Sequence, residues 1–202
     1  PYSLFSKKDY KSLYESSSRA DREELYRWIE YYKIKFKSRV YTPLNNSEKY
    51  TLVLMGRADF GLLGSYNKYK QTPFETFYVG GDGMTGSYTY ATETIGLRGY
   101  DNGALTPYSD GRAYTRFSME LHFPFLLQPS STIYGLAFVE GGNAWTSLEN
   151  FNPFSLKRSA GVGVRIFLPM IGLMGIDWAY GFDKVQGEKG GGHFHFILGQ
   201  EF

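Results

Sequence analysis

Few side chains in this sequence could carry out acid–base or metal chemistry. It contains three histidines and no cysteine. His193 and His195 stand two residues apart near the end of the sequence, while His122 has no nucleophile or paired carboxylate at a telling spacing. The sequence shows neither a Cys/His metal cluster nor a glycine-rich phosphate loop. It therefore predicts that the protein is not an enzyme and uses no metal or cofactor.

Charged side chains recur instead at every second position of several segments. Lys33, Lys35 and Lys37 alternate with apolar residues, and a period of two places the two kinds on opposite faces of a β-strand. The charged positions of this kind are Lys33, Lys35, Lys37, Arg39, Arg57, Asp59, Arg116, Glu120 and Arg165. We expect them to line a polar lumen, although the solvated face of a soluble sheet would show the same pattern.

The last ten residues, 193–202, form the clearest strand of the sequence. Alternate positions on one side of this strand are apolar: Phe194, Phe196, Leu198 and Phe202. The positions on its other side include His195, Gly199 and Glu201. A strand of this length matches the roughly 9–11 residues that cross the hydrocarbon layer of a membrane when tilted. The aromatic end resembles the terminal signature of outer-membrane barrels. An edge strand of a soluble sandwich is the alternative.

The composition favours a membrane barrel. Aromatic residues make up 18% of the chain, and the longest apolar run, 166–176, is interrupted by Pro169 and two glycines. Helical membrane spans are therefore excluded, whereas a barrel shows only alternate residues to lipid and keeps a modest hydropathy. The formal net charge of +2 is too balanced to indicate nucleic-acid binding.

The lengths of the connections support the same architecture. Short turns at 43–48, 128–131 and 169–172 alternate with long connections, of which 64–111 is the longest. Short turns at one end and long loops at the other are typical of outer-membrane barrels. About seven antiparallel strands are expected. Since so few strands cannot enclose this many charges, we interpret residues 1–202 as the C-terminal portion of a larger transmembrane β-barrel.

The first residues are harder to interpret. Pro1–Phe5 could be the end of an earlier strand. Residues 6–28 are charged and lack a period of two, so we expect an extracellular loop. Tyr14, Leu25 and Trp28 could also mark a short amphipathic helix there.

Four motifs in order resemble one family. They are Gly96-Leu-Arg-Gly-Tyr100 with the preceding Phe77-Tyr-Val-Gly-Gly-Asp82, Phe138-Val-Glu-Gly-Gly-Asn-Ala-Trp145, Arg158-Ser-Ala-Gly-Val-Gly-Val164 and the aromatic end of 193–202. This order is similar to that of the BamA-type outer-membrane assembly factors. Leu97 replaces the commoner Val, and Glu140 stands where the family usually has Asp.

The resemblance implies a sixteen-stranded barrel behind periplasmic POTRA domains, with loop 64–111 folded into the lumen. The tip of this loop is Leu97, Arg98, Gly99 and Tyr100. A buried arginine needs carboxylates, so Arg98 should contact Glu120 or Glu140 in the lumen. The alternative is that Arg98 is an ordinary solvent-facing loop residue.

The resemblance also implies an integral outer-membrane insertase. Its clients would be unfolded barrel proteins, its partners accessory lipoproteins and membrane lipid, and no nucleic acid is expected. Clients would enter at a lateral seam beside strand 193–202, whose signal residues are Phe194, Phe196, Leu198, Gly199 and Phe202. Two other functions remain open: a relative that secretes or assembles one dedicated partner, and a passive diffusion pore.

Overall fold

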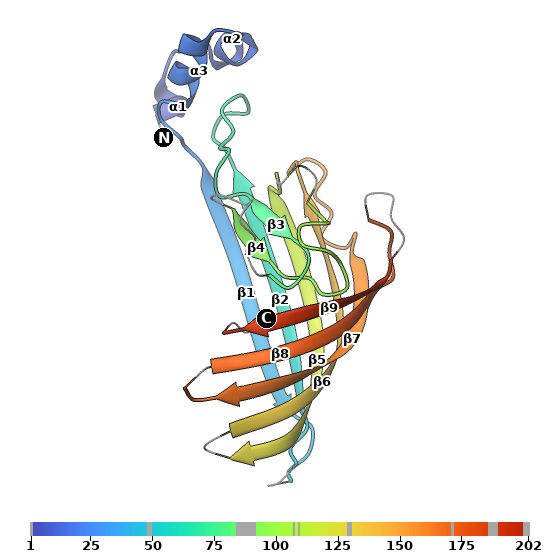
Figure 1. Ribbon diagram of the computed structural model, residues 1–202. Helices are drawn as coiled ribbons and strands as arrows, with labels where there is room; N and C mark the ends of the chain where they lie inside the picture. The colour runs from blue at the N-terminus through green and yellow to red at the C-terminus, as the bar shows by residue number, and fades with distance from the viewer. Residues whose placement is uncertain are drawn as a thin grey trace.

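The computed structural model describes residues 2–47, 50–83, 92–106, 108, 110–128, 131–170, 172–185 and 190–199. Its main element is one antiparallel sheet (Figure 1). In spatial order, the strands are β1 (Tyr32–Pro43), β2 (Val53–Gly64), β5 (Ala113–Gln128), β6 (Ser131–Trp145), β7 (Lys157–Leu168), β8 (Gly172–Gly181) and β9 (Gly192–Leu198). The prediction of seven antiparallel strands is confirmed.

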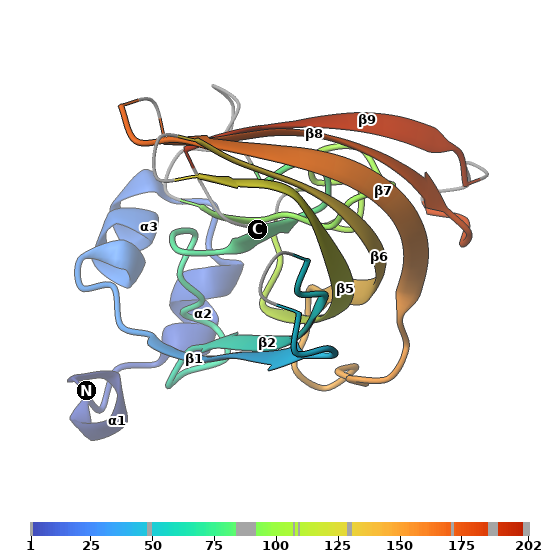
Figure 2. The ribbon, with the colours of Figure 1, turned by 90° about the horizontal axis from the view of Figure 1, so that it is seen from below.

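The sheet is strongly curved and open. Figure 2 shows it wrapping around the segment that links β2 to β5. Within the described part of the chain, β1 pairs only with β2, and β9 pairs only with β8. Because β-barrels close by pairing their edge strands, an open sheet of this curvature is part of a larger barrel.

The two faces of the sheet follow the expected parity. Of the residues expected to face lipid, Phe36, Val162, Val164 and Trp178 are exposed, and Leu54, Phe117 and Ile166 are half-buried. Of those expected to face the lumen, Glu120 and Arg165 are buried, Arg57 is half-buried and Lys35 is exposed. The buried charges thus lie on the face of the sheet that curves around the inserted segment (Figure 2).

The segment between β2 and β5 has its own small structure. β3 (Phe77–Val79) and β4 (Glu93–Ile95) form a parallel pair, which alternation in the sequence did not predict. Apolar side chains of this segment and of the sheet form one buried cluster: Leu63, Phe77, Val79, Ile95, Leu97, Tyr100, Leu105, Tyr114 and Ala144. On the β1 side, Glu93 lies 2.8 Å from Lys33 and 3.1 Å from Lys35, measured between Nζ and Oε2. The segment is therefore packed against the sheet rather than projecting from it.

The chain before β1 is helical, which corrects one expectation. Its helices are α1 (Tyr2–Phe5), α2 (Tyr10–Glu15) and α3 (Arg19–Tyr26). The idea that Pro1–Phe5 ends a strand was wrong, because Glu30 accepts hydrogen bonds from the backbone N–H groups of Tyr2 and Ser3 at the start of α1.

Much of 6–28 is also helical, and a short amphipathic helix was the alternative offered there besides an extracellular loop. The Asp9 carboxylate caps α2 by accepting from the N–H groups of Lys11 and Ser12, and Leu25 is buried on α3. No helix among the described residues is long and apolar enough to cross a membrane.

Candidate functional site: a loop tip that binds five strands

The loop tip, Leu97–Tyr100, lies directly after β4 and reaches the concave face of the sheet. The backbone of Leu97 bridges to Gly81, and its side chain is fully buried in the apolar cluster. Gly99 has a φ of +87°, a left-handed conformation that favours glycine. This turn directs the Arg98 side chain into the sheet, where its exposed fraction is 0%.

Arg98 contacts three carboxylates on three different strands. Its Nη2 donates to Glu120 on β5, and to Oε1 of Glu140 on β6 at 2.7 Å. Its Nη1 donates to Oδ2 of Asp177 on β8 at 3.0 Å. The structure thus brings Arg98 together with both glutamates named from the sequence, and adds an aspartate. A planar guanidinium can serve several oxygens at once, which an ammonium group cannot do in the same geometry.

Glu140 is the most heavily used acceptor of this cluster. Its Oε1 accepts from Nη2 of Arg116 at 2.8 Å and from Oγ of Ser118 at 3.0 Å, besides the bond from Arg98. Its Oε2 accepts from the backbone N–H of Arg98 at 3.0 Å. A buried carboxylate with this many donors is stabilised in its ionised form.

The charges of the cluster balance. Nη2 of Arg165 donates to Oδ2 of Asp177 at 2.7 Å, and His122 Nε2 lies 2.8 Å from Oε2 of Glu120. The buried ionic groups are Arg98, Arg116, Arg165, Glu120, Glu140 and Asp177, three of each sign. Burial of charge is costly unless each group is paired and hydrogen-bonded, and this network meets that condition.

An aromatic ring completes the surroundings of the guanidinium. The Arg98 Cζ lies 3.5 Å from the ring centroid of Phe138 on β6. A desolvated cation over a ring face gains further electrostatic stabilisation. The sequence motif that begins at Phe138 therefore supplies both a ring and, two residues later, a carboxylate to the same arginine.

The two residues after Arg98 bind the remaining strands. The Tyr100 hydroxyl donates to the carbonyl of Arg158 on β7 at 2.6 Å, and burial raises the pKa of this phenol to about 12, so it stays a donor. The backbone N–H of Gly99 donates to Nε2 of His195 on β9 at 2.8 Å. A Cβ on Gly99 would lie 2.8 Å from Ser159 Cβ and 3.0 Å from the Gly181 nitrogen. The tip thus contacts every strand from β5 to β9.

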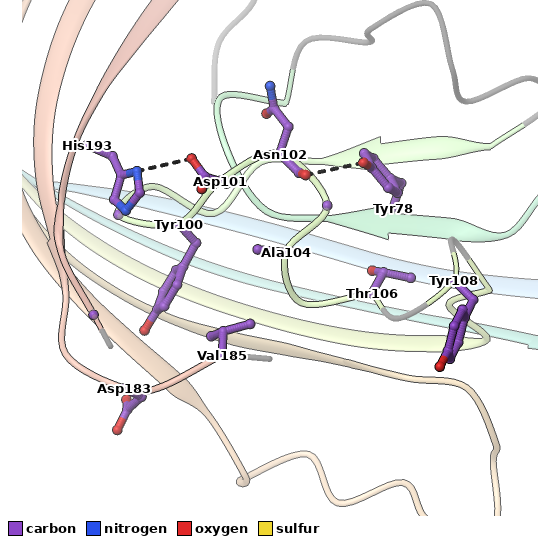
Figure 3. Close-up of a pocket in the computed structure, with 13 residues that line it drawn as sticks. Tyr78, Tyr100, Asp101, Asn102, Ala104, Thr106, Tyr108, Asp183, Val185 and His193 are labelled. Atoms are coloured by element: carbon purple, nitrogen blue, oxygen red, sulfur yellow. Dashed lines mark hydrogen bonds and ion pairs between the residues drawn. The ribbon is translucent and has the colours of Figure 1, made fainter. Parts of the chain in front are cut away.

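A cavity of about 420 Å³ lies beside the tip, between it and the connection from β8 to β9 (Figure 3). His193 of β9 faces Asp101 there, with Nδ1 and Oδ1 3.2 Å apart. On the other side of the cavity the Tyr78 hydroxyl donates to the Asn102 carbonyl at 3.2 Å. The tip is therefore also held by contacts beyond the buried cluster.

The predicted seam residues lie on β9 and just after it. Phe194, Phe196 and Leu198 are exposed on the outer face, whereas His195 is buried on the inner face. Gly199 has a φ of +67°, and its N–H donates to the carbonyl of Leu173 at 2.7 Å. Phe202 lies outside the described residues.

Asp177, His195 and Arg116 belong to the site although none was named as a site residue from the sequence. The signal for all three was their parity, which places them on the inner face with the other charged residues. What parity cannot show is which inner positions lie level with the loop tip, because this depends on the register between strands. In the structure Asp177 and His195 are register partners on β8 and β9.

Sequence comparisons show which known proteins the chain is similar to. The model of the Omp85 superfamily domain matches residues 17–202. The outer membrane protein assembly factor BamA of Neisseria meningitidis serogroup B is 30% identical over 119 residues, which are 58% of this chain and 14% of that protein.

A solved structure shows the same fold. A crystal structure of BamA from Haemophilus ducreyi lacking POTRA domains 1–3 matches with a TM-score of 0.61 and 21% identity, over 83% of this chain and 34% of that one. The chain thus spans only a minor part of these relatives. With its matching domain model, curved antiparallel sheet and inserted loop, the chain belongs to the Omp85 superfamily and forms part of an integral outer-membrane β-barrel.

Proposed function

We propose that the protein of which this chain is part folds and inserts β-barrel proteins into the outer membrane, at a lateral seam beside β9. The observation that carries the proposal is the shortness of β9, the last strand of the described sheet, which offers only a short edge to the strand that it meets in the complete barrel. Such an edge presents backbone N–H and C=O groups that can pair with an incoming strand. The relative named an outer membrane protein assembly factor supports the same activity.

The dimensions of β9 suit this role. It spans seven residues, whereas β5 spans sixteen and β6 fifteen. A short strand offers few backbone hydrogen bonds to whatever lies on its other edge. Each missing bond removes roughly 0.5–1.5 kcal/mol of closure, so the seam can open thermally. The exposed Phe194 and Phe196 give an entering strand an apolar surface at the same place.

The proposal includes clients, partners and the type of activity. The clients are unfolded outer-membrane barrel proteins, and accessory lipoproteins are proposed as partners on the family resemblance alone. The protein acts without a catalytic residue or cofactor, because strand pairing requires no covalent step. A passive pore would instead conduct in the same way whether or not the seam could open.

A reversible lock on the seam tests the proposal. In the full-length protein, one cysteine on β9 and one on the strand facing its free edge should form a disulfide under oxidising conditions. Client insertion into liposomes should stop when the lock is closed and resume on reduction. A matched control joins β9 to β8 through Tyr180→Cys and Gly192→Cys, which are register partners on the edge that is already paired. This control should leave insertion unchanged.

Full insertion with the seam shown to be locked would contradict the proposal. It would leave the dedicated-secretion and pore functions in place. Two measurements on the same locked protein separate these functions. A passive pore keeps its conductance, whereas a secretion channel fails to export its partner.

A further inference from the structure

The bond between His195 and the loop tip differs from the others at the site. The His195 ring is buried, and its Nε2 accepts the backbone N–H of Gly99 at 2.8 Å. Since this nitrogen accepts, the proton of the neutral ring is on Nδ1. The bond therefore joins two uncharged groups.

The neighbouring strands hold the tip with ionised groups. At the same level of the sheet, Asp177 on β8 is the register partner of His195, and it binds both Arg98 and Arg165. Glu120 on β5 and Glu140 on β6 also bind Arg98. Charge-assisted hydrogen bonds are roughly twice as strong as neutral ones. Among the described residues, β5, β6 and β8 contact the tip through buried ionised side chains, whereas β9 contacts it through the neutral ring of His195.

The second histidine of β9, His193, contributes little to the attachment between β9 and the tip. His193 pairs with Asp101, whose side chain is 75% exposed. Exposed ion pairs of this kind contribute little, since solvent screens them. His195 is thus the principal side-chain attachment between β9 and the tip.

We infer that His195 is a positioning residue that latches the seam strand to the loop tip. The latch opens before the ionic cluster does, so β9 can leave the tip while the tip stays bound to β5, β6 and β8. The inference rests on the proposed function, because it describes how the seam is held closed between clients. It also gives the tip a second role, namely setting how often the edge of β9 at the seam is available to a client.

Hydrogen–deuterium exchange on the full-length protein in lipid nanodiscs, without clients, tests the latch. In His195→Leu the backbone amides of β9 should exchange roughly 2- to 10-fold faster, as expected for loss of one neutral hydrogen bond. The segment 96–101 should stay close to the wild-type rate, except for the Gly99 amide itself. His195→Gln should restore slow exchange of β9, because its side-chain oxygen can accept the same bond.

Two further variants separate the latch from simple packing. His195→Phe keeps a flat ring without an acceptor, so it should behave like His195→Leu and serves in its place if that variant does not fold. Phe194→Leu changes the neighbouring outward position on β9 and should leave exchange at the wild-type rate.

Two results would overturn the inference. One is wild-type exchange of β9 in both His195→Leu and His195→Phe, and the other is equally fast exchange in His195→Gln. The outcome does not depend on client insertion, which the seam lock tests separately. If client insertion continues with the seam locked while β9 exchanges faster in His195→Leu, the proposed function is rejected and the attachment is kept. If the lock stops insertion while β9 exchanges at the wild-type rate, the latch alone is rejected.

Discussion

Replacing Arg98 with alanine is expected to free the loop tip from the sheet and to reduce client assembly strongly. Breaking a buried ion pair by removing one partner costs about 3–5 kcal/mol, because the other charge is left uncompensated. The loss falls unevenly on the three carboxylates. Glu140 and Asp177 keep Arg116 and Arg165, whereas Glu120 keeps only the contact with His122 among those described above.

The unfolding free energy of the purified full-length barrel in lipid measures this effect, with the client-insertion rate measured in parallel. The strands should remain formed, so the far-ultraviolet circular dichroism should be unchanged. Arg98→Lys is the matched control, since it keeps the charge and loses the planar fork, and it should give an intermediate result. Equal stability of wild-type and Arg98→Ala proteins would show that the cluster does not hold the tip.

The arrangement of the tip explains why this effect should spread beyond the loop. Arg98, Gly99 and Tyr100 together bind β5, β6, β7, β8 and β9. Five strands joined through one loop are constrained in their curvature as well as in their pairing. Loss of the arginine would remove the links to β5, β6 and β8, and would leave the tip bound through Gly99, Tyr100 and the apolar cluster.

The alternation of apolar and polar residues predicted the sheet and its two faces, because the direction of a side chain in a strand depends only on its position along that strand. A period of two is a direct consequence of strand geometry, so Phe36 and Val164 could be assigned to one face and Glu120 to the other. A contact of Arg98 with Glu120 or Glu140 was also expected, and the structure has both. That expectation came from the family resemblance together with the requirement that a buried arginine has a carboxylate.

Other features depend on contacts that are distant in the sequence. Asp177 reaches Arg98 across 79 positions, and His195 reaches Gly99 across 96. Helix α1 depends on Glu30, which lies 28 positions after Tyr2. No periodicity records such pairs, since register and loop placement decide them. For the same reason the parallel pairing of β3 with β4 was not predicted.

Introducing a charge on the outer face should be costly in a lipid bilayer. Val164 is exposed on the outer face of β7, next in sequence to the buried Arg165. Val164→Arg should lower the unfolding free energy in bilayers by about 2–4 kcal/mol, because an arginine at mid-depth must leave water for hydrocarbon. Val164→Leu is the matched control, since it changes size without adding charge, and it should cost much less. Reversible unfolding of the full-length protein in liposomes measures both. If the two variants unfolded with the same free energy, Val164 would not face lipid, and the outer and inner faces assigned to the whole sheet would have to be exchanged or abandoned.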